Sequence, residues 1–258
     1  MQIPQHLNSP PMKKLLLAAA VIAAAFSSGA LAQQWTNVNV NAGANGFDNW
    51  TENNTSGNGS QNGRFTSNPG VMGTSWGLYA NSGQTAANIY NFSTTLPVGG
   101  YVQIDVSLGF NNGGTVGFSL QNSTGANRFE TYYIGNDPTD AFKLNDAGGQ
   151  ENITGPNTTF SNSSWNATPQ QFQTIRFTLR AANTYTLSFD GVDVSNAGLT
   201  ISASDISRIR IFNSNAGSGD GNNQYFNNLQ AVPEPSTYAL LGFAATGLGA
   251  HMIRRRRR

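Results

Sequence analysis

The chain has 258 residues, of which only 10% are charged, and its formal net charge is +1. It contains no cysteine, which excludes disulfides and thiolate metal sites. Its two histidines, His6 and His251, lie near the ends. The region between them therefore has no imidazole base and no histidine ligand, which excludes serine triads and histidine-bound zinc.

The first 32 residues have the pattern of a secretory signal peptide. The apolar run Leu15–Phe26 is followed by small residues at Ala30 and Ala32, the spacing that signal peptidase reads, so cleavage would leave Gln33 as the mature N-terminus. An uncleaved anchor is the alternative, but a run of about a dozen apolar residues is short for a membrane span. We expect export through the Sec translocon.

The segment before the apolar run supports the same interpretation. Lys13 and Lys14 form the positive region of a signal peptide, and Met12 directly precedes them. Residues 1–11 are therefore expected to be a start assigned too far upstream or a dispensable extension.

Residues 33–231 are expected to form one all-β domain. Residues 33–232 carry seven Lys and Arg against twelve Asp and Glu, a formal charge of −5, which argues against nucleic-acid binding.

The clearest period-two pattern is Tyr101–Phe110, which predicts a strand with one buried face and one wetted face. The wetted face is expected to carry Gln103, Asp105 and Ser107. A turn at 111–114 and renewed alternation at 116–120 predict a hairpin.

Similar patterns predict the rest of the sheets. Further strands are expected at Phe129–Ile134, Ile175–Leu179, Thr184–Phe189, Val192–Val194, Ile206–Ile211 and Tyr225–Ala231. A second hairpin is expected to join 175–179 to 184–189, and Asp190-Gly191 predicts a tight turn after it. Residues 53–59 are expected to form a loop, and Trp35, Phe47 and Trp50 are expected to be core anchors. Short strands with Gly-rich turns favour a two-sheet antiparallel sandwich.

Several segments resemble a known sandwich. The segments that carry the resemblance are Trp76–Ala80, Phe172–Phe177, Tyr185–Gly191 and Tyr225–Leu229. Together they look like a concanavalin A-like jelly roll, the sandwich of lectins and glucanases, over Trp76 to Leu229. A galactose-binding-like sandwich is the competing architecture.

Enzymatic glycan cleavage is not expected. Glucanases of the resembled fold carry closely spaced acids along one strand, and no expected strand here has that pattern. Glu130 stands alone on its strand, and Asp190 lies with Asp193 at a turn. We expect no catalytic residues.

Metal and sugar sites stay open at this stage. Oxygen ligands for a structural calcium are present in the loops, but Asp and Asn in loops usually serve turns; they are Asp137, Asp140, Asp146, Asp220, Asn222 and Asn223. No other cofactor or metal is expected. Aromatic candidates for stacking on a sugar are Trp165, Tyr132 and Tyr133, although such rings more often fill a sandwich core.

The C-terminal residues 232–258 combine three signals. The first is Val232, Pro233, Glu234 and Pro235. An apolar run, Tyr238–Ile253, follows and could just span a membrane as a helix. Five arginines end the chain and would hold that end in the cytoplasm; they are Arg254, Arg255, Arg256, Arg257 and Arg258. A permanent tail anchor is the simpler alternative.

This order resembles the PEP-CTERM sorting signal of Gram-negative bacteria. The resemblance implies recognition and cleavage by exosortase, a membrane-embedded protease, after an inner-membrane intermediate. It also implies delivery to the cell surface or an exopolysaccharide matrix. The sequence thus predicts a structural or adhesive surface protein, with a specific carbohydrate-binding module as the alternative and a glycan hydrolase as a remote third.

Overall fold

The computed structural model describes residues 36–54, 61–70, 72–108, 111, 113–159, 172–196 and 198–233. Trp35, Trp165, the expected signal peptide and the expected membrane span lie outside this part of the chain. Where the chain is described, no helix is both long enough and apolar enough to cross a membrane.

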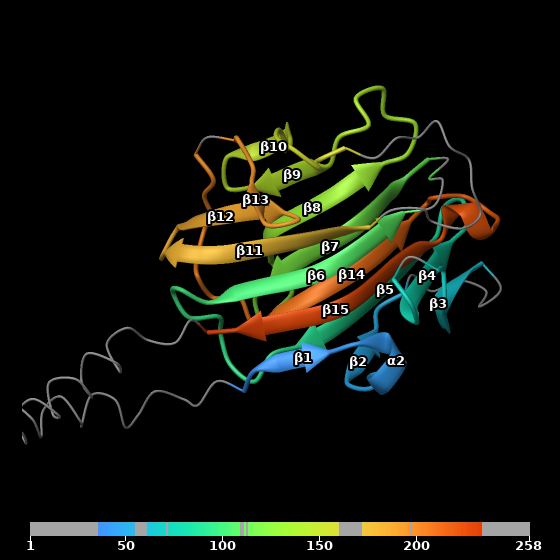
Figure 1. Cartoon of the computed structure of the whole chain (residues 1–258), viewed down its shortest axis with the longest axis horizontal. Helices are drawn as coiled ribbons and strands as arrows, with labels where there is room; N and C mark the ends of the chain where they lie inside the picture. Colours follow the sequence, from blue (N-terminus) through green and yellow to red (C-terminus); the bar gives the residue numbers. More distant parts are fainter. Residues whose placement is uncertain are drawn as a thin grey trace, which may run out of the picture. The chain divides into compact units, whose positions relative to one another are not determined.

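The described residues form two antiparallel sheets (Figure 1). Sheet A has the order β13-β12-β11-β6-β15-β4-β3, and β1 also pairs with β15. Sheet B has the order β10-β9-β8-β7-β14-β5-β2. The strands of sheet A are β1 (Val38–Val40), β3 (Asn62–Ser67), β4 (Ser75–Ala80), β6 (Tyr101–Leu108), β11 (Gln173–Ala181), β12 (Thr184–Phe189), β13 (Val192–Asp193) and β15 (Gln224–Val232).

Sheet B and two short helices complete the described elements. The strands of sheet B are β2 (Trp50–Glu52), β5 (Thr85–Asn91), β7 (Thr115–Gln121), β8 (Asn127–Ile134), β9 (Lys143–Asp146), β10 (Gly149–Asn152) and β14 (Arg208–Ser214). The helices are α2 (Ala42–Asn45) and the 3₁₀ turn η1 (Asp220–Asn222). The predicted two-sheet jelly-roll sandwich is confirmed.

One hydrophobic core joins the two sheets because alternate residues of each strand point inward. At one end of the core the rings of Trp50 and Trp76 lie 5.1 Å apart. At the other end Phe177 of β11 stacks on Tyr185 of β12, with ring centroids 4.7 Å apart. Phe129 of sheet B lies 5.1 Å from Phe177 and closes the contact between the sheets. The aromatic side chains thus bind the sandwich together at both ends.

The first predicted hairpin is wrong, whereas the second is confirmed. β6 pairs with β11 and β15, and β7 pairs with β8 and β14, so the chain crosses from sheet A to sheet B between them. A turn between two alternating strands has the same sequence pattern whether the strands pair or face each other across a core. β11 and β12 do pair, with Phe177 opposite Leu187.

The wetted face predicted for β6 is also only partly correct. Gln103 is half-buried, but Asp105 and Ser107 are buried. The Asp105 carboxylate accepts a 2.7 Å hydrogen bond from Thr174 Oγ1 and another of 2.7 Å from Asn228 Nδ2. Polar neighbours on β11 and β15 therefore cover this part of the outer face.

Candidate functional site

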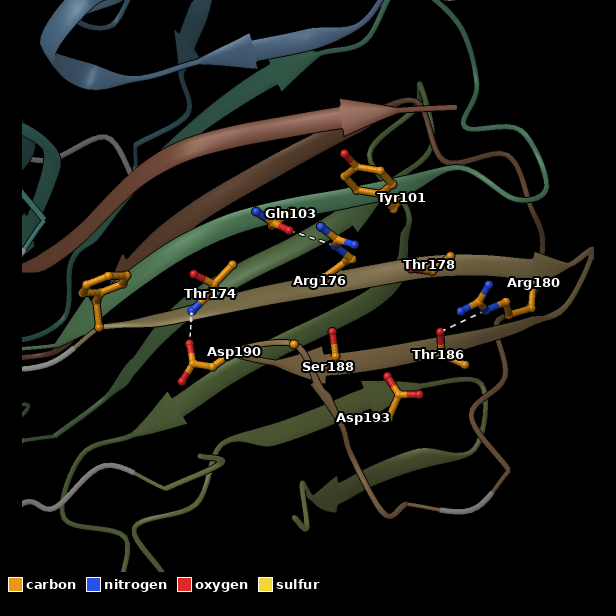
Figure 2. A pocket seen from close by; sticks show the side chains of 12 residues that line it. Tyr101, Gln103, Thr174, Arg176, Thr178, Arg180, Thr186, Ser188, Asp190 and Asp193 are labelled. Carbon is orange, nitrogen blue, oxygen red and sulfur yellow. Dashed lines mark hydrogen bonds between the residues drawn. The ribbon is translucent and has the colours of Figure 1, made fainter. Parts of the chain in front are cut away.

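A groove of about 610 Å³ lies on the outer face of sheet A, over β6, β11, β12 and the turn into β13 (Figure 2). We call it the polar groove. It is lined by side chains that hydrogen-bond and by two aromatic rings, namely Tyr101, Gln103, Phe172, Thr174, Arg176, Thr178, Arg180, Thr186, Ser188, Asp190, Gly191 and Asp193. This mixture of rings with polar groups is typical of small-ligand sites.

The alternation of β11 creates the groove. Ile175, Phe177 and Leu179 point into the core and are fully buried. Successive residues of a strand point to opposite faces, so the polar residues between them line the groove. The same residues that build the core thus fix the spacing of Thr174, Arg176, Thr178 and Arg180 along the outer face.

Arg176 occupies a fixed position in the groove. Its Nε donates a 2.8 Å hydrogen bond to Gln103 Oε1, and its guanidinium carbon lies 4.4 Å from the centre of the Tyr101 ring. Figure 2 shows the guanidinium between these two β6 side chains. Among the described residues no carboxylate lies within ion-pair distance of Arg176. Neutral partners thus orient the arginine without cancelling its charge.

Arg180 gives the groove a second positive side chain on the same strand. Its Nε donates a 3.2 Å hydrogen bond to Thr186 Oγ1 of β12. Four residues along a strand correspond to about 13 Å, which separates the two arginines along the groove. This spacing suits an extended ligand better than a compact one.

The acidic edge of the groove is a tight turn. Asp190 and Gly191 both have positive φ, 51° and 80°, and join β12 to β13 as a two-residue hairpin loop. The Asp190 carboxylate accepts a 2.8 Å hydrogen bond from the backbone N–H of Thr174 (Figure 2). The predicted Asp-Gly turn is confirmed, and its carboxylate serves the fold by tying the turn to β11.

Asp105 supports the groove from the neighbouring surface. Burial raises the pKa of its carboxyl group, and the hydrogen bonds from Thr174 and Asn228 act in the opposite direction. Because Thr174 lines the groove and bonds Asp105, the buried carboxyl group holds one wall in place.

The tyrosines predicted as sugar contacts are buried. Tyr133 is 1% exposed, and its hydroxyl donates a 3.0 Å hydrogen bond to Asp140. Tyr132 is 7% exposed and packs with Ala87 and Phe212 on the outer face of sheet B. Neither ring has a free face for a sugar, in agreement with the packing alternative. Trp165 lies outside the described residues.

Two of the predicted calcium ligands, Asp137 and Asp146, serve other contacts. Asp137 lies 3.0 Å from Lys143 Nζ, and Asp146 accepts a 2.7 Å hydrogen bond from the Tyr185 hydroxyl. The hydrogen bonds from Thr139, and next the contact with Lys143, lower the pKa of Asp137. Within the described ranges no three acidic or histidine side chains gather in a way that could hold a metal. Calcium binding has no geometric support in this part of the chain.

Glu130, the isolated acid of β8, lies on the outer face of sheet B. Its carboxylate accepts a 2.9 Å hydrogen bond from Asn127 Nδ2. Burial raises its pKa, while the positive charge of Arg210 and the Asn127 bond lower it. Glu130 therefore takes part in a polar contact on the outer surface of sheet B.

Sequence reasoning missed the polar groove. The signal was present, because the alternation that assigned Ile175, Phe177 and Leu179 to the core also assigns Arg176 to the opposite face. What the sequence lacked was the neighbour of β11, since the pairing with β6 brings Gln103 and Tyr101 to Arg176.

The C-terminal residues match a known sorting signal. Residues 231–258 match the family model described as the PEP-CTERM protein-sorting motif. The chain carries a PEP-CTERM signal. This confirms the resemblance over the tail, and the PEP-CTERM motif begins inside β15, whose last residue, Val232, pairs with Tyr101. Pro233, which has no N–H, follows directly and cannot extend the ladder.

Comparison with other proteins describes the sandwich that carries the PEP-CTERM signal. No curated protein matches the chain. Among solved structures, cellulose induced protein Cip1 is 12% identical with a TM-score of 0.48, over 72% of this chain and 92% of that one. Carbohydrate-binding module CBM66 from Bacillus subtilis is 11% identical with a TM-score of 0.40, over 70% and 93%. A tetrameric galectin from the ball sponge Cinachyrella is 15% identical with a TM-score of 0.39, over 56% and 98%. Likenesses at this level identify neither a ligand nor an activity.

Proposed function

We propose that this chain is an exported protein that exosortase processes and delivers to the cell surface, where the sandwich has a structural or adhesive role in exopolysaccharide. The observation that supports the proposal is the PEP-CTERM motif at 231–258, which begins in the last two residues of the last strand of the fold. Because β15 lies between β6 and β4 in sheet A, a cut before Val232 would remove part of an internal strand. Cleavage after Pro233 would leave the sandwich whole.

The test is the C-terminal peptide of the protein recovered from its native host, with and without exosortase. We expect a product that ends between Pro233 and Thr237 and that requires the enzyme. Glu234→Ala, which changes the motif but not the described fold, should leave Arg258 in place and keep the protein in the membrane fraction. An intact Arg258 terminus on the wild-type protein would make it a permanently anchored protein and would refute the proposal.

The polar groove favours a second candidate function, a carbohydrate-binding module. The observation behind it is Arg176, which is oriented by Gln103 and Tyr101 yet has no described carboxylate partner. Such an arginine can donate hydrogen bonds to sugar hydroxyls and can bind the carboxylates of acidic sugars. The proposal includes no catalytic step, since glycoside cleavage needs two carboxyl groups about 5–10 Å apart across the substrate. The acidic residues of the groove, Asp190 and Asp193, both belong to the β12–β13 hairpin at the edge of sheet A.

Affinity electrophoresis in purified host exopolysaccharide tests this second function. Arg176→Ala should lower the affinity by about tenfold, because truncating a charged hydrogen-bond donor costs about 1.5–3 kcal/mol. Arg208→Ala is a matched control, since Arg208 of sheet B also donates its Nε to a glutamine, Gln121 Oε1, at 3.0 Å. Equal losses in the two variants, or none in either, would exclude the polar groove as the binding site.

A further inference from the structure

A second group of side chains on the outer face of sheet A lies at the opposite side of the sheet from the polar groove. It consists of two half-buried rings, Phe65 of β3 and Tyr79 of β4, beside a hollow of about 370 Å³. The rest of the hollow is polar and is lined by Asn81, Gly217, Gly219, Asp220 and Asn223. We call the two rings the aromatic shelf.

Each ring of the shelf leans over a glycine of the neighbouring strand. Phe65 is the register partner of Gly77, and Tyr79 is the register partner of Gly63. A β-carbon at Gly77 would lie 2.4 Å from Phe65 Cζ, and one at Gly63 would lie 2.8 Å from the Tyr79 hydroxyl oxygen. Any other residue at either glycine would therefore push a ring away from the sheet.

Glycine inside a strand is unfavourable, and it often marks a place where another group approaches the backbone closely. Here two such glycines let both rings lie low across the sheet, 6.2 Å apart, with their outer surfaces toward the hollow. Tyr225 of β15 meets Phe65 edge-on at 88° and 5.9 Å, which fixes the Phe65 ring from the other side. The shelf is thus held in position before any ligand binds.

The polar rim of the hollow is fixed as well. The loop after β14 is tied to β4, since Gly217 N donates to Ala80 O at 3.2 Å. Asn213 of β14 holds both segments, since its Nδ2 donates to Leu78 O at 3.0 Å and to Asn222 O at 2.9 Å. η1 follows and places Asp220 and Asn223 beside the rings. Amide and carboxylate groups next to aromatic faces can bond the hydroxyls of a sugar whose apolar face lies on the rings.

The geometry points to a second binding site, which takes one or two pyranose rings of a neutral glycan. The charges favour a neutral ligand, because Asp220 is the charged side chain among the described lining residues and would repel a carboxylated sugar. The shelf shares no lining residue with the polar groove. Its test is therefore independent of the polar groove.

NMR titration of the full mature chain tests the site. The probes are cellohexaose, laminarihexaose and mannohexaose, each up to about 10 mM, the range in which weak affinities become visible. We expect at least one of them to shift the aromatic signals of Phe65 and Tyr79 and the side-chain amide signals of Asn81 and Asn223. Hexagalacturonate, which carries carboxylates, should leave these signals unchanged.

Paired variants separate binding from packing. Phe65→Leu and Tyr79→Leu keep an apolar cover over Gly77 and Gly63 but remove the ring, so each should weaken binding of the responding hexasaccharide by about tenfold or more. Tyr79→Phe keeps the ring and should stay within about threefold of wild type. Arg176→Ala should not change this affinity.

Three results would overturn the site. The first is an absence of shifts at the shelf with all three neutral probes. The second is a shelf response to hexagalacturonate alone. The third is wild-type affinity in the folded Phe65→Leu and Tyr79→Leu variants, which would leave the rings with the structural role of covering the glycines.

Discussion

The two hollows on the outer face of sheet A share one supporting sheet but are built from different chemistry. In the polar groove, long charged side chains rise from β11 and are oriented by neutral partners on β6 and β12. At the aromatic shelf, two rings lie across glycines on β3 and β4. The comparison shows that a strand can shape a hollow on its outer face either with long side chains or with glycines that let neighbouring rings approach the backbone.

The core beneath the two hollows should contribute equally to stability. Trp76→Ala under the shelf and Phe177→Ala under the polar groove each remove a ring that is 0% exposed. Each should lower the free energy of unfolding by about 3–5 kcal/mol, measured by urea denaturation. A much smaller loss for one of them would mean that this half of the sandwich packs loosely, and the comparison between two rigid sites would fail.

The tight turn at the edge of the polar groove should be the next most sensitive position. Asp190→Ala loses the hydrogen bond to Thr174 N and places an alanine at a φ of 51°, so it should lower the unfolding free energy by about 1–2 kcal/mol. Asp190→Asn, which keeps an acceptor and tolerates positive φ, is the control and should stay near wild type. If both variants unfold at the same urea concentration as wild type, the turn does not hold the groove edge.

Gly77→Ala should separate stability from geometry at the shelf. The new methyl group meets Phe65, whose ring can swing outward, so the unfolding free energy should change by less than about 1 kcal/mol. The Phe65 ring contacts to Gly77 and Tyr225 should nevertheless disappear from NOE spectra. Unchanged contacts in the folded variant would contradict the close approach on which the shelf rests.

The ion pair between Arg128 of sheet B and Asp205 is expected to have the smallest effect on stability. It contrasts with Arg176, which has no carboxylate partner among the described residues. Arg128 binds Asp205 through two hydrogen bonds, of 2.5 and 2.8 Å, and this lowers the pKa of Asp205 to about 2. A carboxyl group whose pKa is lower in the folded protein stabilises the fold at pH values above its unfolded pKa of about 4. This contribution disappears as the pH falls through about 2. The loss should be below about 1 kcal/mol because the pair is partly exposed.

Urea midpoints between about pH 5 and pH 2 measure this effect. Asp205→Asn should flatten the pH dependence, whereas Arg176→Ala should leave it unchanged, since Arg176 bonds neutral groups. An equal flattening in Arg176→Ala would reveal a carboxylate partner and would weaken the distinction between a structural arginine and a ligand-binding one.

Period-two alternation predicted the long central strands and their inward residues, because it depends only on which face of each strand is buried. The shorter or less regular strands β1, β2, β3, β5, β9 and β10 were not predicted. It could not predict sheet order. For this reason the hairpin expected after β6 is an arch between sheets, and the burial of Asp105 could not be anticipated. Both hollows depend on neighbours from distant parts of the chain, Gln103 beside Arg176 and Tyr225 beside Phe65. The sorting signal, by contrast, is a contiguous motif, and the sequence alone identified it.

The position of β15 has a mechanical consequence. For a chain held by the residues that follow Val232, a pull on a ligand in the polar groove would load β15 along its length against β6, with which it pairs over 224–227 and 230–232. A ladder pulled in this direction shares the load among all its hydrogen bonds at once, whereas a ladder pulled sideways opens one bond at a time. In such a chain the load would enter the fold through an internal strand of sheet A.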